Sequence, residues 1–127
     1  ATEVRVELAE LLLGEERFAE VLAVVNPVEV ENETRSDWLG RYYVARAVSL
    51  LNTGEYDVLL QGIRESRQQE LESEPMLLLE LVAAEAALQL GDRSQAATAL
   101  AAVIEIAPES PEAIAARRLR QDLLAAD

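Results

Sequence analysis

Lysine, histidine and cysteine are absent from this chain of 127 residues, and all eleven basic residues are arginine. The chain therefore lacks imidazole, thiol and primary amine side chains, which serve most often as general bases, covalent nucleophiles, Schiff-base formers and ligands of soft metals. The acid-base route that remains needs two carboxylates with separated pKa values in one cleft, for which Glu10 and Glu85 are the candidates. We expect no enzyme, no metal site and no cofactor.

Aromatic residues and long apolar runs are also scarce. Aromatic residues make up 4% of the chain against 50% for all apolar residues, so the core must come from leucine, valine, isoleucine and 21 alanines. No apolar run reaches the roughly 20 residues of a membrane-spanning helix, and no basic segment leads into an apolar stretch at the start. The chain is long enough to bury about two thirds of its unfolded surface. We expect one soluble, cytoplasmic domain over 1–127, in a chain that begins at Ala1 as a processed protein or as a piece of a longer one.

The charge of the chain is strongly one-sided, with a formal value of −13 at pH 7. Phosphates repel an acidic surface, so the charge disfavours nucleic acid and anionic membranes as partners and leaves a basic protein partner. A composition free of lysine and rich in glutamate, alanine and arginine is equally typical of a halophile, in which the charge serves solubility. Both interpretations stay open at this point.

Three stretches, 8–25, 45–63 and 83–108, share one layout of an apolar helix, a short turn and an amphipathic helix. One alignment of the three stretches places the alanines Ala9, Ala47 and Ala84 at equivalent positions. It also aligns the residues after the turns, Phe18, Tyr56 and Arg93. The spacings are then 38 and 37 residues, which suits repeated helical hairpins. The alternative superposes Gly14, Gly54 and Gly91 and shifts the first unit by two residues. We prefer the alanine register, because it pairs the aromatic residues Phe18 and Tyr56.

The pattern of apolar residues predicts seven helices, at 2–14, 16–25, 36–53, 56–71, 75–90, 93–106 and 110–125. Ser110 and Pro111 are typical of the N-cap and first position of the last helix. The segment 26–34 lacks a helical period and is expected to be a long loop. In the last helix we expect Ile114, Leu119 and Leu123 to face inward, while the basic cluster Arg117, Arg118 and Arg120 stays in solvent.

The third stretch resembles a tetratricopeptide repeat. It has the small residues Ala84 and Ala96, the turn Gly91-Asp92, Leu100 at a large-residue position and a closing Ala107-Pro108. The other two stretches resemble the family less closely. The resemblance implies an all-α solenoid of three stacked hairpins over about 2–25, 36–71 and 75–108, with a capping helix at 110–125. In that family the first helices of the hairpins line a concave groove that binds a protein segment.

Carrying this geometry over places ten residues in the partner-binding groove. They are Glu7, Glu10, Arg41, Val44, Val48, Leu51, Asn52, Leu81, Glu85 and Leu88. Val6 and Leu78 are also expected on the groove face. The helix at 75–90 is apolar on nearly all sides, so something should cover it. The resemblance therefore predicts a protein-protein interaction module for an apolar peptide or helix with a basic end. The alternative is an assembly domain whose groove is filled by a second copy, as a homo-oligomer, or by the rest of a longer chain.

Overall fold

The computed structural model describes residues 2–28 and 36–125, and over these ranges it consists of seven α-helices without strands. The helices are α1 (Thr2–Gly14), α2 (Phe18–Val25), α3 (Ser36–Asn52), α4 (Tyr56–Ser66), α5 (Ser73–Leu90), α6 (Arg93–Ile106) and α7 (Pro111–Ala125). The all-α prediction and the number of helices agree with this structure. Most of the long loop predicted at 26–34 lies outside the described residues.

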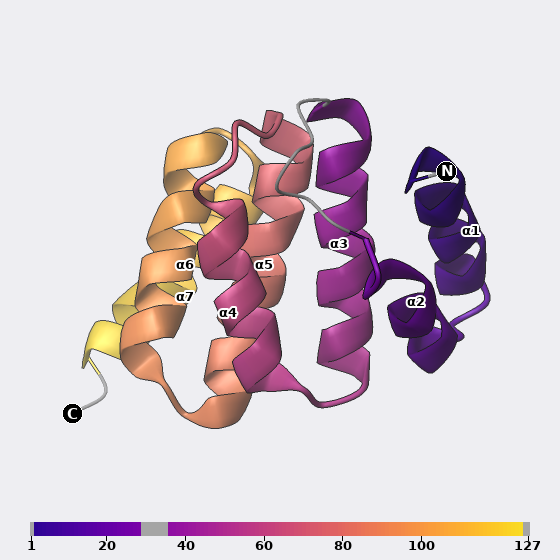
Figure 1. Cartoon of the computed structure of the whole chain (residues 1–127). Coiled ribbons are helices and arrows are strands. Elements are labelled where there is room, and N and C mark those ends of the chain that lie inside the picture. The colour runs from indigo at the N-terminus through magenta and orange to yellow at the C-terminus, as the bar shows by residue number, and fades with distance from the viewer. Residues whose placement is uncertain (1, 29–35, 126–127) are drawn as a thin grey trace.

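The helices extend from α1 and α2 at one end of the molecule, through α3, α4 and α5, to α6 and α7 at the other end (Figure 1). Each helix packs against the next one along the chain. In addition α1 packs against α3, and α3 packs against α5. The corresponding contact between α5 and α7 is missing among the described helices, so α7 is held by α6 alone.

The turns inside the three hairpins have the same backbone geometry. Glu16, Gly54 and Gly91 each adopt a left-handed conformation, with φ of 58°, 76° and 73°. In each case the next residue donates its amide to a carbonyl five residues earlier, as Arg17 does to Leu12. The second helix then begins one residue later, at Phe18, Tyr56 and Arg93. The alanine register is therefore correct, and Glu16, not Gly14, is the counterpart of the two turn glycines.

Three predicted helix boundaries differ from the structure by two residues or more. Helix α2 begins two residues later than predicted, because Glu16 in a left-handed conformation interrupts the chain of helical hydrogen bonds. Helix α4 ends at Ser66 instead of residue 71; the Ser66 hydroxyl donates to the carbonyl of Ile63, and the irregular segment after it buries Leu71. Helix α5 begins two residues before Pro75, since a missing amide hydrogen is tolerated anywhere in the first turn.

Side-chain caps define the starts of α6 and α7. The Asp92 carboxylate accepts from the Gln95 backbone amide at 3.0 Å and from the Gln95 side chain at 2.7 Å, and these hydrogen bonds lower the pKa of Asp92. The Ser110 hydroxyl accepts from the Ala113 amide at 3.0 Å, and Pro111 is the first helical residue, as predicted. Both caps satisfy amides that have no acceptor within their helix.

One apolar core runs through all seven helices, and small residues are numerous among the buried residues of α5 and α6. The buried alanines there are Ala83, Ala84, Ala86, Ala87, Ala96 and Ala99. At the contact between α5 and α3, the absent side chain of Gly40 on α3 makes room for the ring of Pro75; a Cβ at Gly40 would lie 2.9 Å from the Pro75 Cγ. Close approach of helices thus depends on residues with little or no side chain.

The aromatic group of α3 belongs to this core. Trp38, Tyr42 and Tyr43 are each less than 10% exposed, and their rings meet edge to face, with centroids 6.2 Å apart for Trp38 and Tyr42 and 5.1 Å apart for the two tyrosines. These rings therefore line no open ligand cage.

The predicted inner face of α7 is wrong in part. Ala113 and Ala116 are buried, whereas Ile114 is 60% exposed and Leu119 is 38% exposed. Only Leu123 of the three predicted residues is partly buried against the core. Because α7 packs against one helix and not two, a narrow strip of small residues is enough to hold it.

Candidate binding surfaces

The ten residues predicted for the groove define a surface that we call the α1–α3–α5 surface. All ten are exposed or partly buried, and the three helices that carry them contact one another in the order α1, α3, α5. The prediction that Val6 of α1 lies on the groove face is wrong, because Val6 is fully buried in the core. The spacing of the ten positions matches the helical period, which is why the backbone turns them to the same side of each helix.

A pocket of about 370 Å³ lies at one end of this surface. It is lined by Glu10, Leu13, Arg41, Val44, Ala45, Glu72, Glu74, Pro75 and Leu78. Three of the ten predicted residues therefore share a pocket, and the other seven do not line it. Its rim carries three glutamates against one arginine, so its electrostatic character is acidic.

Arg41, the single basic residue predicted for the groove, forms an ion pair with Glu10 across the contact between α3 and α1. The Arg41 Nε lies 3.1 Å and 3.0 Å from the two Glu10 carboxylate oxygens, and Nη2 donates to the same carboxylate. The two side chains are 44% and 38% exposed, so the pair contributes about 0.2 to 1 kcal/mol to stability. Glu10 thus neutralises the Arg41 charge, and Glu85 does not line the pocket that contains Glu10.

Helix α5 has an apolar side that the other described helices cover only in part. Leu78 is 43% exposed and Leu88 is 38% exposed, while Leu81 and Val82 are partly buried. The buried alanines of α5 lie on its other sides. The prediction that α5 needs a cover on every side is therefore unmet within residues 2–28 and 36–125.

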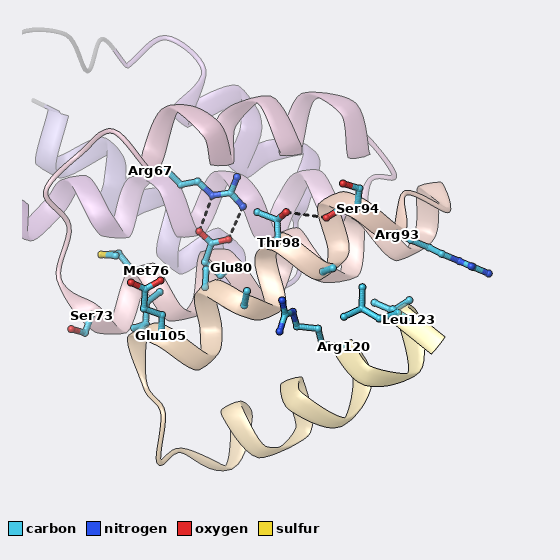
Figure 2. A pocket seen from close by; sticks show the side chains of 15 residues that line it. Arg67, Ser73, Met76, Glu80, Arg93, Ser94, Thr98, Glu105, Arg120 and Leu123 are labelled. Atoms are coloured by element: carbon cyan, nitrogen blue, oxygen red, sulfur yellow. Dashed lines mark hydrogen bonds and ion pairs between the residues drawn. The ribbon is translucent and has the colours of Figure 1, made fainter. Parts of the chain in front are cut away.

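A second and larger opening, with a volume of about 1110 Å³, lies between α6 and α7 and extends to the start of α5. We call it the α6–α7 cleft. Its lining residues are Arg67, Ser73, Met76, Glu80, Arg93, Ser94, Ala97, Thr98, Ala101, Ala102, Glu105, Ile106, Arg120, Leu123 and Leu124. In Figure 2, Arg120 and Leu123 extend from α7 toward α6, whereas Arg93 points away from the other side chains.

This cleft is not among the features predicted from the sequence. Its signal is the alanine content of α6: Ala96 and Ala99 bury one side of the helix, while Ala97, Ala101 and Ala102 leave the other side only partly covered. An amphipathic surface helix normally carries large polar residues there. Small residues on both sides of α6 therefore indicate that one side packs in the core while the other is left open.

An ion pair closes one edge of the cleft. The Arg67 Nε and Nη2 donate to the two oxygens of Glu80 at 2.9 Å and 2.8 Å, and Glu80 is only 6% exposed (Figure 2). The hydrogen bonds to Glu80 raise the pKa of Arg67. The fork geometry of guanidinium and carboxylate satisfies a buried acid on a largely apolar helix. The pair thus connects the end of α4 to the first half of α5.

The described residues contain neither a group of metal-ligating side chains nor a membrane-spanning helix. Within residues 2–28 and 36–125, no three acidic residues are grouped so that they could hold a metal ion. No helix in these ranges combines the length and the apolar character needed to cross a bilayer. Comparison of the chain with known protein families, with curated proteins and with solved structures finds no match in any of the three.

Proposed function

We propose that this protein is a non-enzymatic interaction module of the tetratricopeptide type, which binds an apolar helix or extended segment with a basic end on its α1–α3–α5 surface. The half-exposed apolar side of α5 beside an acidic pocket is the observation that carries the proposal. Exposure of these apolar side chains to water is unfavourable. Their burial against a partner gains about 25 cal/mol for each Å² of apolar surface removed from water.

The repeat assignment draws support from contacts between neighbouring helices. Successive helices pack in pairs, and α1, α3 and α5 also pack in series. This is the contact pattern of a linear stack of hairpins, in which each unit contacts only its neighbours. The equivalent turns at Glu16, Gly54 and Gly91 support three hairpins of one kind.

The chemistry of the partner follows from the charges around the apolar side of α5. Glu74 and Glu85 are exposed on α5 itself, and Glu72 lies directly before it. Arg41 is already paired with Glu10. A segment with leucine-like anchors and arginine or lysine at one end therefore fits, whereas an acidic tail is repelled.

An NMR titration tests this proposal. The probe is a synthetic amphipathic peptide of leucine and arginine, and the control peptide replaces each arginine by glutamate. We expect the amide signals of Val44, Leu78 and Leu81 to move with the basic peptide only. Leu78→Glu should weaken binding by about tenfold or more, as expected for a central apolar anchor.

Val58→Glu is the matched control variant, because Val58 on α4 is 41% exposed and Leu78 is 43% exposed. A nonspecific attraction between a basic peptide and a protein of charge −13 would be strengthened equally by both variants. Equal behaviour of the two variants, or equal binding of the two peptides, contradicts the proposal.

A further inference from the structure

Two apolar features at opposite ends of the molecule take no part in the α1–α3–α5 surface. The first is a stripe on α1, formed by Val4, Leu8 and Leu11, which are 65%, 46% and 71% exposed. The second is the α6–α7 cleft. Figure 1 shows α1 at one end of the series of helices and α6 and α7 at the other. We propose that the α1 stripe of one copy docks in the α6–α7 cleft of a second copy, so that the chain associates head to tail.

The spacing of the stripe makes it a single row on the outer side of α1. Residues 4, 8 and 11 are separated by four and three positions, so they lie in one line along the helix. Val6 and Ala9, both fully buried, face the opposite way, toward α2 and α3. The row therefore points away from the rest of its own molecule, where a second copy can reach it.

The cleft has the size and floor that a docking helix needs. Helix α1 has 13 residues and is about 20 Å long, which is close to the length of the 14-residue α6. Ala97, Ala101 and Ala102 form a floor of small side chains, over which a second helix can approach closely. Leu123 and Leu124 supply an apolar wall, and Leu124 is 60% exposed in the single copy.

Glu105 lines the cleft on the α6 side and Arg120 on the α7 side, and the Arg120 charge complements the acidic flank of the stripe. Arg120 lines the cleft on the α7 side and makes no ion pair or hydrogen bond within the described residues. Glu7, exposed on α1 beside the stripe, is also without such a partner there. Docking of the stripe in the cleft brings the Glu7 carboxylate to the α7 side of the cleft, which holds the Arg120 guanidinium.

Charge and shape also argue against pairing of like with like. Two α1 stripes facing each other would bring together their flanking acids Glu3 and Glu7. Two clefts facing each other would leave both hollow, since neither offers a protruding apolar row. The contact is therefore heterologous: each copy uses one surface as donor and the other as acceptor, and growth continues with concentration.

Sedimentation velocity and light scattering test this inference with the full chain. The mass of the wild-type protein should rise from 13.9 kDa toward dimers and larger species between micromolar and millimolar concentration. Leu11→Glu on the stripe and Thr98→Glu on the exposed cleft side of α6 should each raise the dissociation constant by about 10 to 100 times. Ile114→Glu is the control, because Ile114 is 60% exposed and does not line the cleft.

Mixing the two disrupted variants is the decisive step. The Leu11→Glu copy keeps an intact cleft and the Thr98→Glu copy keeps an intact stripe, so an equimolar mixture should form a dimer that does not grow further. The inference is overturned if the wild type stays monomeric at millimolar concentration, if Thr98→Glu associates as the wild type does, or if the mixture stays monomeric. Circular dichroism of each variant confirms that it is folded. Peptide binding by Leu78 and its neighbours is measured separately, so each proposal can fail alone.

Discussion

Two glycines inside helices provide the sharpest test of the packing, because replacement by alanine should shift stability in opposite directions. A Cβ at Gly40 would lie 2.9 Å and 3.0 Å from the Cγ and Cβ of Pro75. A Cβ at Gly62 would lie 2.5 Å from the Arg46 Nη1, with the next atom, Cζ, at 3.8 Å. The ring of Pro75 is rigid and fixed in the first turn of α5, whereas the Arg46 guanidinium is the free end of a flexible side chain.

The magnitudes follow from two opposing contributions. Replacing glycine by alanine inside a helix gains about 1 kcal/mol, since the unfolded chain loses conformational freedom. Forcing an extra methyl group against a packed neighbour costs about 1 to 3 kcal/mol. Gly40→Ala should therefore lower the free energy of unfolding by roughly 1 kcal/mol. Gly62→Ala should raise it by roughly 0.5 to 1 kcal/mol, because the guanidinium turns aside.

Urea unfolding followed by far-ultraviolet circular dichroism measures both changes. Gly62→Ala serves as the matched control for helix propensity, so the difference between the variants isolates the contact between α3 and α5. Stabilisation of Gly40→Ala as large as that of Gly62→Ala would refute the argument. Because Pro75 also lines the pocket of the α1–α3–α5 surface, Gly40→Ala should in addition shift the NMR signals around that pocket.

Further predictions concern polar groups in the core. Ser49→Ala should raise the free energy of unfolding by about 1 kcal/mol, because the Ser49 hydroxyl is fully buried and has no hydrogen-bond partner among residues 2–28 and 36–125; urea unfolding measures this change. Glu80→Gln should lower it by roughly 1 to 2 kcal/mol, less than for a fully buried pair since Arg67 is 36% exposed, and the Glu80→Leu, Arg67→Met double variant should recover most of the loss. Burial raises the pKa of Tyr42 and Tyr43 above the ordinary 10.0, so the folded state holds their protons longer than the unfolded state. The stability that they contribute is complete below pH 10.0 and should fall as the pH rises above it, which unfolding curves between pH 9 and pH 11 would show.

The sequence predicted the helices and the register of the hairpins because both depend on local residues. The apolar period placed all seven helices, and Ala9, Ala47 and Ala84 are all buried, as equivalent positions in the hairpins should be. The errors in boundaries arose where a residue takes an unusual conformation. A glutamate is rarely left-handed, so nothing in the local pattern marked Glu16 as the end of a turn.

The candidate surfaces depend on which helices contact each other, and the sequence carries little of that information. The ion pair between Arg41 and Glu10 joins residues 31 positions apart, so the sequence shows both charged residues but not that they pair. The α6–α7 cleft exists because α7 does not reach α5, a distant contact whose absence no periodicity reports. Alanine compounds the difficulty, because it is small enough to lie either in a core or on the floor of a cleft.

The attachment of α7 to a single helix also has a consequence for motion. A helix held on one side can detach without disturbing the core of its neighbours, so its opening free energy should be a fraction of that for global unfolding. Amide hydrogens of α7 should then exchange with solvent by this local route, faster than those of α3 or α5. Closure of the α6–α7 cleft by a second copy would slow that exchange, and the chain would report its own assembly through the protection of its last helix.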